Sequence, residues 1–474
     1  MAQFALTVRR VVALNWKVSP RLYIGQLAVS VAQGTLPLVS AYLAGRLLGD
    51  LAATIARPTT QLESGLLVLL VGLMLIQFVM LQLGNLQQYL GDLFALAFDK
   101  YVQLRLYAQV HALDQSYYED QAFNNLLNKI RQNLFSLQNL NRNFLYSVDS
   151  LVEAGTSAVA LAVLSPILAV VITIALIPTL VIEVRTSFQR WRTWEDERGN
   201  DRRQQWYINS LLLDPEALRE IKLYGLKDFL LGRWEHHFEA TRKLSLKIER
   251  RAQRYRTVIG ILNALVDLGA QVWLIMRVLG RHLDLGAFVF YRQLIYNYRN
   301  AGAGLVRNLH SMQEQSLYVN DYFNLMAMKP QIELAKAGYK VPAGKPPRIE
   351  FEGVSFAYPG SAELVLREVS FVLEPGDDLA IVGENGAGKT TLIKLLLRLY
   401  DPTAGRILIN GHDLRDVDLT SWYGRVGTLF QDFNHYRSFT VGDNIYAGRT
   451  ESRSLPKAIE QAAQEAGAAQ FIDQ

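Results

Sequence analysis

Long apolar runs fill much of the sequence between residues 22 and 306, and they constrain the fold more than any other feature. A helix that crosses a lipid bilayer needs about 20 predominantly apolar residues. The longest run is too long for one crossing, but Ser165-Pro166 divides it, because a proline can begin a helix but not continue one. We therefore predict six membrane spans, at residues 22–48, 65–93, 144–164, 167–184, 257–279 and 285–306.

The polar segments between the spans predict the orientation of the chain. Segments 94–142 and 185–256 are long and helix-like, whereas 50–63 and 281–284 are short. The second long segment carries 17 Lys/Arg against 11 Asp/Glu, and such an excess marks the cytoplasmic side. We expect the N-terminus and both long segments in the cytoplasm. The sequence thus predicts a multi-pass protein of the cytoplasmic (inner or plasma) membrane.

Composition excludes several other classes of protein. The 474 residues include no cysteine, which excludes disulfides, Cys-ligated zinc, Fe–S clusters and a thiol nucleophile. Half of the residues are apolar, which excludes a largely disordered chain. The net charge of +5 is explained mostly by the cytoplasmic segments, so we expect the lipid bilayer as a partner and no nucleic acid.

Beyond about Pro347 the long apolar runs give way to short β-branched runs punctuated by glycine, and one motif stands out there. A buried strand is predicted before it, at 378–382, and an apolar helix after it, at 391–399. The motif matches G-x-x-x-x-G-K-[ST] and consists of Gly383, Glu384, Asn385, Gly386, Ala387, Gly388, Lys389 and Thr390.

The chemistry of a phosphate site explains these residue types. Glycines let backbone N–H groups turn toward phosphates at the N-terminus of a helix. Lys389 can reach the β- and γ-phosphates of a nucleotide, and the Thr390 hydroxyl can ligate Mg²⁺. Thr391, the next residue, joins them in the predicted nucleotide site. The sequence therefore predicts ATP and Mg²⁺ as cofactors.

Two weaker signals flank this motif. Tyr358 lies about 25 residues upstream, where an aromatic ring could stack on adenine. Gln431 ends a predicted strand, 426–430, about 40 residues past Lys389, where its amide could ligate Mg²⁺ or orient water. Either residue alone is more often an ordinary turn, core or surface residue.

These signals, in this order and behind six spans, resemble the ATP-binding cassette (ABC) exporters, in the form of a half-transporter. In the family's terms Tyr358 corresponds to the A-loop aromatic, 383–390 to Walker A and Gln431 to the Q-loop glutamine. The stretch 440–445 is similar to the T-V-x-x-N-I stretch after the Q-loop. On the cytoplasmic loops, 220–225 and 117–120 resemble further family patterns.

The resemblance implies a fold and a domain plan. The fold is multi-domain, with an all-α six-helix transmembrane domain that has long cytoplasmic helix extensions, followed by an incomplete α/β P-loop nucleotide-binding domain. The transmembrane domain would cover 1–320, the linker 321–346 and the partial nucleotide-binding domain 347–474. Coupling helices would lie near 117–126 and 212–223.

The resemblance also implies a mechanism and a partner. Two nucleotide-binding domains would close around two ATP molecules and switch the membrane cavity between inward- and outward-facing forms. Lys389 and Gln431 would act in catalysis. A second half-transporter, identical or different, would supply the signature loop. The cargo could be a peptide, a lipid or a drug-like molecule, with the cytoplasmic loop residues faintly similar to exporters of ribosomally made peptides.

The sequence departs from the family pattern after Gly448. The signature loop, the Walker B Asp-Glu pair and the switch histidine are not found before Gln474. We therefore expect a truncated sequence that binds ATP poorly and hydrolyses it negligibly by itself. A degenerate, regulatory ABC subunit without turnover is one alternative, and a non-transport P-loop protein acting on DNA or in translation is a second.

Ionisable residues inside predicted spans are candidates for a role in transport. Asp149 and Glu153 are four residues apart and share a helix face. Asp267 lies in the fifth span, and Arg292 and Arg299 interrupt the sixth. A polar cavity for cargo and structural pairing between helices explain these residues equally well.

Overall fold

The computed structural model describes residues 2–55, 64–192, 199–332, 337–431, 433–448 and 456–472. The chain forms two compact units, which are described separately. We call Met1–Gln331 the helical unit and Ile332–Gln474 the α/β unit.

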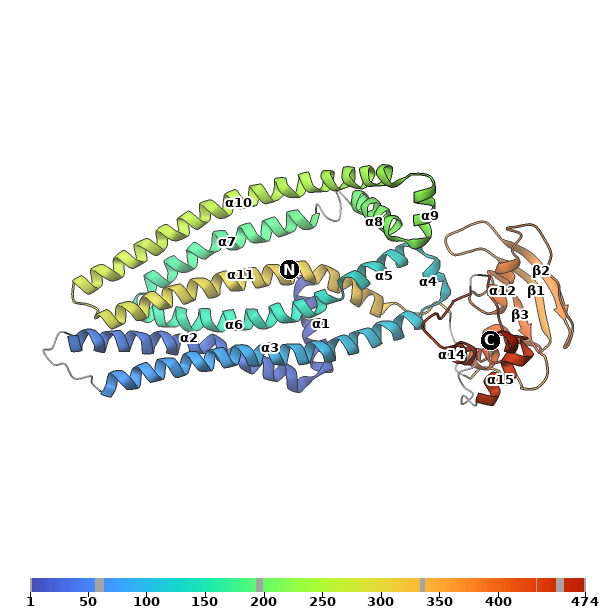
Figure 1. Ribbon diagram of the computed structural model, residues 1–474, viewed down its shortest axis with the longest axis horizontal. Coiled ribbons are helices and arrows are strands. Elements are labelled where there is room, and N and C mark those ends of the chain that lie inside the picture. Colours follow the sequence, from blue (N-terminus) through green and yellow to red (C-terminus); the bar gives the residue numbers. More distant parts are fainter. Residues whose placement is uncertain are drawn as a thin grey trace. The chain divides into compact units, whose positions relative to one another are not determined.

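The helical unit consists of long helices joined by short connections (Figure 1). Its described helices are α1 (Ala2–Val18), α2 (Pro20–Ile55), α3 (Ser64–Ala112), α4 (Gln115–Glu119), α5 (Gln121–Asn133), α6 (Phe135–Leu164), α7 (Pro166–Arg192), α8 (Gly199–Leu213), α9 (Pro215–Leu223), α10 (Lys227–Leu279) and α11 (Leu285–Ala327). Helices α6 and α7 are separated at Ser165, whose extended backbone ends α6 before the proline that starts α7.

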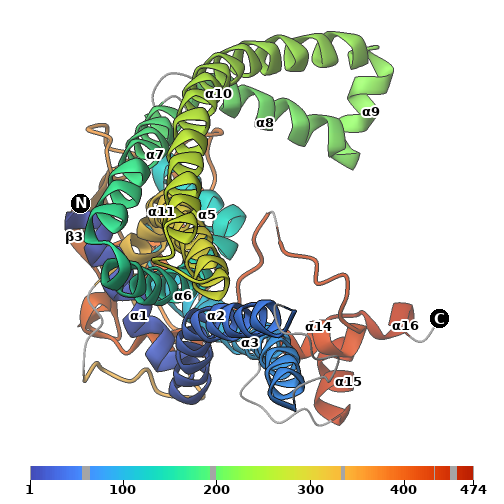
Figure 2. The same ribbon diagram turned by 90° about the vertical axis from the view of Figure 1, so that its left-hand side faces the viewer.

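The long helices of this unit pack in two groups. Helices α2, α3, α6 and α11 pack together, and α10 packs along α7 and α8. Helix α10 runs along the outside of the unit, and α8 and α9 project away from α2 and α3 (Figure 2). At about 1.5 Å per residue, the 49 residues of α3 and the 53 residues of α10 extend well beyond the roughly 30 Å of a bilayer core.

Each of the six predicted spans falls within one of these helices. Among the described residues, four helices are long and apolar enough to cross a membrane, namely α2, α3, α6 and α10, and α7 contributes a shorter apolar stretch, Pro166–Thr179. Helix α11, which contains 285–306, is not one of the four. It also continues to Ala327, so the predicted linker, 321–346, begins inside a helix.

The largest buried core of the helical unit lies mostly outside the predicted spans, and a smaller cluster around Leu274 lies within them. Phe98, Leu140 and Leu325, from α3, α6 and α11, are fully buried in one cluster. Within the predicted spans many apolar side chains of α3 and α10 face outward instead. This difference is typical of helices whose outer surface meets lipid in one part and water in the other.

The α/β unit is organised around an antiparallel sheet. Its strands are β1 (Ile349–Phe356), β2 (Leu366–Leu373), β3 (Ala404–Ile409) and β4 (His412–Asp413), in the order β2-β1-β3-β4. Phe351 of β1 pairs with Phe371 of β2, and their rings stack with centroids 4.5 Å apart. The helices are α12 (Lys389–Leu396), η2 (Leu414–Asp416), α13 (Leu419–Tyr423), α14 (Val441–Ala447), α15 (Pro456–Glu465) and α16 (Ala469–Ile472).

Two strands predicted from the sequence are wrong. Residues 378–382 and 426–430 form no strand, and no described residue pairs with them in a ladder. Their apolar side chains stay exposed, with Val382 at 92% and Leu429 at 83% of full exposure. A strand needs a hydrogen-bonded neighbour, and the described chain provides none beside these segments.

Candidate functional site

The loop 383–388 and the start of α12 form the centre of the candidate site. Gly386 and Gly388 have φ values of +89° and +88°, in the left-handed region that favours glycine. A Cβ on Gly388 would also lie 2.7 Å from Leu366 Cδ2. Both effects require glycine at position 388, so the loop motif is explained by the backbone path that it takes.

Helix α12 begins immediately after Gly388, and no side chain caps its N-terminus. The first N–H groups of a helix have no partner within the helix, and the helix dipole adds positive charge there. A phosphate is the ligand that such an end accommodates best. The residues present therefore fit the phosphates of a nucleotide.

Lys389 adds a positive charge to the loop. Its ammonium Nζ donates to the carbonyl oxygens of Gly383 and Glu384, at 2.6 and 2.7 Å. The side chain thus folds back over the loop and does not extend into solvent. The two carbonyls are neutral acceptors, so a phosphate oxygen would compete for the same ammonium with a stronger, charge-assisted bond.

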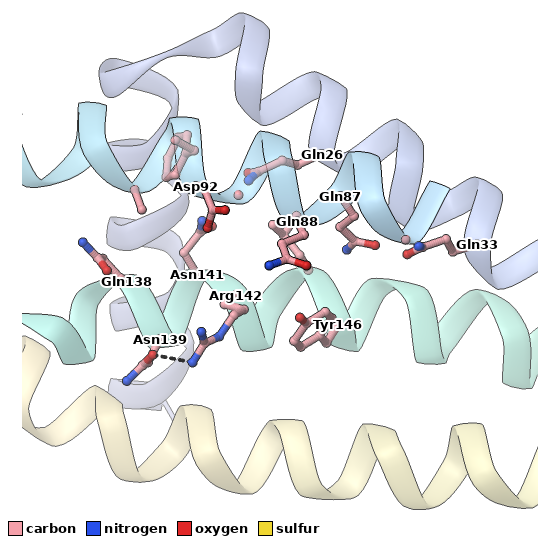
Figure 3. A pocket seen from close by; sticks show the side chains of 15 residues that line it. Gln26, Gln33, Gln87, Gln88, Asp92, Gln138, Asn139, Asn141, Arg142 and Tyr146 are labelled. Atoms are coloured by element: carbon pink, nitrogen blue, oxygen red, sulfur yellow. Dashed lines mark hydrogen bonds between the residues drawn. The ribbon is translucent and has the colours of Figure 1, made fainter. Parts of the chain in front are cut away.

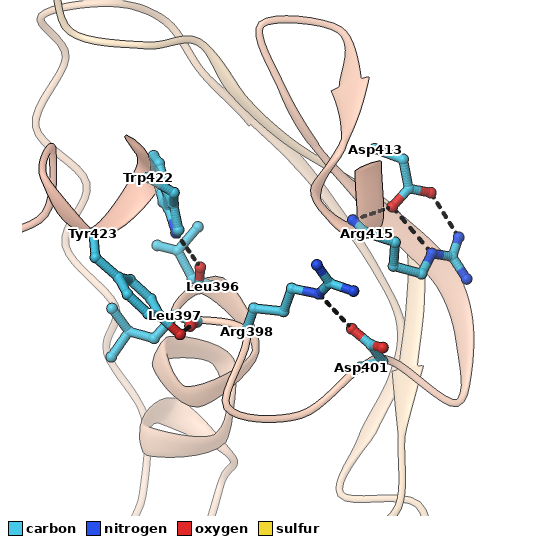
Figure 4. Close-up of polar contacts among 8 residues, drawn as sticks. All are labelled: Leu396, Leu397, Arg398, Asp401, Asp413, Arg415, Trp422 and Tyr423. Carbon is cyan, nitrogen blue, oxygen red and sulfur yellow. Dashed lines mark hydrogen bonds and ion pairs between the residues drawn. The ribbon is translucent and has the colours of Figure 1, made fainter. Parts of the chain in front are cut away.

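Packing holds α12 against the sheet. Leu392 and Leu395 are buried in the core of the α/β unit together with Phe351 and Ile407. The C-terminal end of the helix is held by α13 (Figure 4). Trp422 Nε1 donates to the Leu396 carbonyl at 3.0 Å, and Tyr423 Oη donates to the Leu397 carbonyl, also at 3.0 Å. These bonds satisfy carbonyls that a helix end leaves unpaired. The sheet and α13 therefore hold α12 in place, and with it the loop 383–388 (the phosphate loop) that precedes it.

The structure brings Tyr358 and Thr391 together. The two hydroxyl groups are 3.0 Å apart and hydrogen-bonded. Lys394 Nζ lies 5.2 Å from the centroid of the Tyr358 ring, and the Tyr400 ring meets that ring edge-on at 5.5 Å. Tyr358 is therefore attached to the phosphate-loop helix, on the side of α12 that also carries Lys394. The sequence did not indicate Lys394, because its position depends on how α12 packs.

The other predicted site residues are less closely connected. Thr390 occupies the second position of α12 and is exposed. Gln431 lies in a turn after the extended segment 426–430, and no hydrogen bond in the described part of the chain joins it to the phosphate loop. The geometry therefore groups Lys389, Thr391 and Tyr358 but leaves Gln431 apart from them.

Several motif residues in the loops act as helix caps. Thr440 and Asp443 form a capping box at the start of α14. Asp120 accepts a bond from Ala122 N at 2.8 Å at the start of α5, which covers most of the predicted coupling segment 117–126. In the other segment, 212–223, Asp214 caps α9 by accepting from Glu216 N at 3.0 Å. These local bonds explain why threonine and aspartate occupy these positions.

Within the helical unit the structure pairs two of the ionisable candidates. Arg299 Nη1 of α11 contacts Asp267 Oδ2 of α10 as an ion pair. Arg292 is exposed, and Asp149 and Glu153 have no ion-pair partner within the described residues. Interhelical pairing therefore explains Asp267 and Arg299, whereas the two carboxylates of α6 are left for another explanation.

Comparisons with known protein families agree with this architecture. The ABC transporter transmembrane region matches residues 23–295, and the ABC transporter domain matches residues 366–474. The fold is similar to that of a bacterial Atm1-family ABC exporter solved with ATP bound, with a TM-score of 0.77 and 21% identity over 96% of this chain and 79% of that chain.

Relatives of this chain include two bacterial transport ATP-binding proteins. The chain is 31% identical over 288 residues to the subtilin transport ATP-binding protein SpaT of Bacillus subtilis, covering 60% of this chain and 45% of that protein. It is 24% identical over 379 residues to the nisin transport ATP-binding protein NisT of Lactococcus lactis subsp. lactis, covering 78% of this chain and 62% of that protein. The chain thus spans about half of the length of these relatives.

Proposed function

Because this chain belongs to the ABC transporter family, we propose that it is one half of an ATP-driven exporter in the cytoplasmic membrane. The observation that carries the proposal is the phosphate loop 383–388, which opens an uncapped helix in the same chain as a multi-pass membrane domain. In a chain that carries both a nucleotide site and membrane helices, ATP binding and hydrolysis can drive the movement of a cargo molecule across the bilayer.

Each residue of the site has a role in this proposal. The N–H groups at the start of α12 bind the β- and γ-phosphates, and Lys389 moves from the two loop carbonyls onto those phosphates. The Thr390 hydroxyl would ligate Mg²⁺, which would neutralise phosphate charge when bound. The Tyr358 ring would stack on adenine, and Gln431 would act near the metal once nucleotide is present.

The transport cycle in this proposal requires a second half-transporter, identical or different. ATP would hold the two nucleotide-binding domains together, and hydrolysis would release them. ATP can bias the membrane domain only through a difference in affinity between the two conformations. The cytoplasmic helices near 117–126 and 212–223 would couple that difference to the spans.

We further propose a peptide as the exported molecule. The names of two relatives, a subtilin transport protein and a nisin transport protein, support this class. The proposal is limited to the class of cargo and names no particular peptide.

Nucleotide binding by the protein in lipid nanodiscs tests the site directly. Charged hydrogen bonds contribute about 1.5–3 kcal/mol, so Lys389→Ala should weaken the affinity for a fluorescent ATP analogue by about ten- to a hundredfold. Lys457→Ala, which changes an exposed lysine of α15, is the matched control. Equal affinity in the two variants would contradict the assignment of the phosphate loop.

The role of Tyr358 can be separated from that of the phosphate loop. Stacking of a base on an aromatic ring contributes about 1–3 kcal/mol, so Tyr358→Ala should weaken ATP binding by about fivefold or more. Tyr358→Phe keeps the ring but loses the bond to Thr391, and it should retain most of the affinity. If Tyr358→Phe is as weak as Tyr358→Ala, the hydroxyl and not the ring is responsible.

Export itself is tested in inside-out proteoliposomes. ATP should cause peptide to accumulate in the vesicle lumen, and Lys389→Ala should abolish the accumulation. If the protein binds nucleotide but neither hydrolyses it nor moves peptide with any second half-transporter, the regulatory alternative replaces the exporter proposal.

A further inference from the structure

A cavity of about 590 Å³ lies in the helical unit between α2, α3 and α6 (Figure 3). Seven of its fifteen lining residues are glutamine or asparagine. Its volume is within the range of small-ligand sites, which is roughly 300–1,000 Å³. A concentration of amide side chains in one cavity of a membrane domain is unusual, because such domains rarely place polar groups inside the bundle without a function.

Small residues of α3 create the space for this cavity. Gly91 lies opposite Gln26 of α2, and Gly84 lies opposite Gln33. A Cβ on either glycine would be 3.8 Å from the facing amide nitrogen. The glutamines and the glycines are each seven residues apart, which is about two helical turns, so each set shares a face. Larger residues at 84 and 91 would fill the cavity, and the glycines keep it open.

The amides are only partly satisfied by the protein. Gln26 is 2% exposed, and its Oε1 has no hydrogen-bond partner in the described part of the chain. Gln87 Nε2 donates to Ser30 Oγ at 3.1 Å, which leaves its carbonyl oxygen as an acceptor. Buried amide oxygens are normally hydrogen-bonded, because leaving one unpaired destabilises the fold. A ligand with N–H groups would supply the missing donor.

The charges of the lining identify the class of ligand. The cavity contains one acid, Asp92, and one base, Arg142, and Arg142 Nη2 is bonded to Asn139 Oδ1 at 2.7 Å (Figure 3). The lining is therefore neutral overall, which does not favour phosphate-bearing or strongly cationic ligands. Amide side chains present both donors and acceptors, as the peptide group does. Phe94 and Leu145 add apolar surface to the same lining.

We propose that this cavity binds a short, uncharged stretch of a polypeptide cargo through its backbone and side-chain amides. The inference rests on the proposed exporter function and adds a binding site for the proposed cargo class. Gln26, Asp92 and Tyr146 lie at the ends of predicted spans that face the cytoplasm. The cavity is thus at the side from which an exporter takes its cargo.

The absence of cysteine in the chain allows a site-specific test in nanodiscs without nucleotide. Gln88 is an exposed residue of the lining. The variant Gln88→Cys is labelled at its thiol with an environment-sensitive fluorophore, and every other substitution is made in this labelled variant. The probe is a capped, uncharged pentapeptide of asparagine and leucine. We expect saturable binding that Gln26→Leu weakens about threefold to tenfold, the effect of one lost hydrogen bond. Gly91→Leu, which fills the cavity, should abolish binding.

Matched controls make the result specific. Gln77→Leu changes an exposed glutamine of α3 outside the cavity and should leave the affinity unchanged. A purely structural role of Gln26 predicts altered stability with unchanged affinity, so Gln26→Leu with wild-type peptide binding would overturn the proposal. Gln33→Leu, expected to lower affinity similarly, keeps the test valid if Gln26→Leu fails to fold.

Three further outcomes would also overturn it. One is equal binding of a β-linked glucose pentasaccharide, and another is the absence of any peptide signal in protein that binds nucleotide. The third is protection of the Gln88→Cys thiol from labelling by the fluorophore when no peptide is present, if that protection increases as two copies of the chain associate. The cavity would then be part of a contact between the two copies. Peptide binding without nucleotide binding would instead contradict the proposed exporter function and leave the cavity assignment intact.

Discussion

Helix α3 and the segment 378–382 are both apolar and both largely exposed, yet only α3 has regular structure. Leu75 of α3 is 61% exposed, and Val382 is 92% exposed. A helix forms its backbone hydrogen bonds within itself, so it can present apolar side chains to lipid over its whole length. A strand depends on a neighbour for the same bonds, and the described chain gives 378–382 none.

The same contrast exists inside the α/β unit. The antiparallel strands β1, β2 and β3 have neighbours and bury Phe351 and Ile409 almost completely. The segments 378–382 and 426–430, before and after α12 in the chain, pair with no strand in the described part of the chain and leave most of their apolar side chains exposed. The phosphate loop thus takes its position from the antiparallel sheet, α12 and α13, and not from the segment that leads into it.

The largest expected effect tests this contrast with a matched pair of leucines. Leu395 of α12 is fully buried and Leu429 is 83% exposed. Leu395→Ala should lower the free energy of unfolding of the α/β unit by about 2–5 kcal/mol, and Leu429→Ala by no more than about 0.5 kcal/mol. Trp422 is the one tryptophan in residues 332–474. Urea unfolding followed by fluorescence therefore measures both variants in a background in which the other six tryptophans are replaced by phenylalanine.

Equal destabilisation by the two variants would mean that 426–430 is packed in solution. The contrast between the paired and unpaired parts of the unit would then disappear. Circular dichroism of the same samples checks that the change in fluorescence reports unfolding and not only a local change around Trp422, whose Nε1 is bonded to the Leu396 carbonyl.

The next largest effect compares the two apolar segments directly. Proline inside a helix removes a backbone hydrogen bond and costs about 3 kcal/mol. Leu75→Pro should therefore lower the thermal unfolding temperature of the nanodisc-embedded protein, measured by circular dichroism, whereas Leu75→Ala should not. Ile381→Pro should have little effect, because residue 381 belongs to no ladder. A large loss of stability from Ile381→Pro would show that 378–382 is a strand after all.

Features with local causes could be predicted from the sequence. Pro166 begins a helix because a proline fits a first turn, and the glycines at 386 and 388 adopt positive φ values because the phosphate loop requires them. Each of these depends on a few neighbouring residues. The long apolar helices could be predicted for the same reason, because apolar composition is a local property of each segment.

Features that depend on distant partners could not be predicted. The strands at 378–382 and 426–430 were wrong because apolar, β-branched residues do not specify a partner strand. The bond between Tyr358 and Thr391 joins residues 33 apart, and the amide-lined cavity requires three helices to meet. For Asp267 the sequence left pairing and cargo binding equally open, and only the packing of α10 on α11 identified Arg299 as its partner.

A smaller effect is expected where membrane helices approach closely. Gly45 and Gly49 of α2 face Gly286 of α11, and a Cβ on Gly286 would lie 2.5 Å from Gly45 O. Such small residues let helix backbones meet. Gly286→Ala should therefore lower thermal stability by about 1–3 kcal/mol through overpacking. Gly269→Ala, with nothing within 4 Å of its added Cβ, should be neutral or stabilising, because alanine favours helix. Stabilisation by both variants would contradict the close approach.

The smallest effect concerns β4, at the edge of the paired part of the α/β unit. Burial acts to raise the pKa of Asp413, but hydrogen bonds from the side chain and backbone of Arg415, together with its charge, outweigh burial and lower that pKa. The contacts include Arg415 Nη2 to Asp413 Oδ2 at 2.6 Å and Arg415 Nε to Oδ1 at 3.0 Å (Figure 4).

A carboxyl group whose pKa is lower in the folded state stabilises the fold above its unfolded pKa, which is about 4. This stabilisation is lost as the pH falls through the lower, folded pKa. For a partly exposed pair it should amount to no more than about 1 kcal/mol. The stability of the α/β unit, measured by urea unfolding from pH 6 downward, should therefore fall less steeply in Arg415→Leu than in the wild type. An identical decline in both would mean that the Asp413–Arg415 pair does not persist in solution. The edge of the sheet would then be held by the β3–β4 ladder alone, which strengthens the conclusion that strand pairing orders this unit.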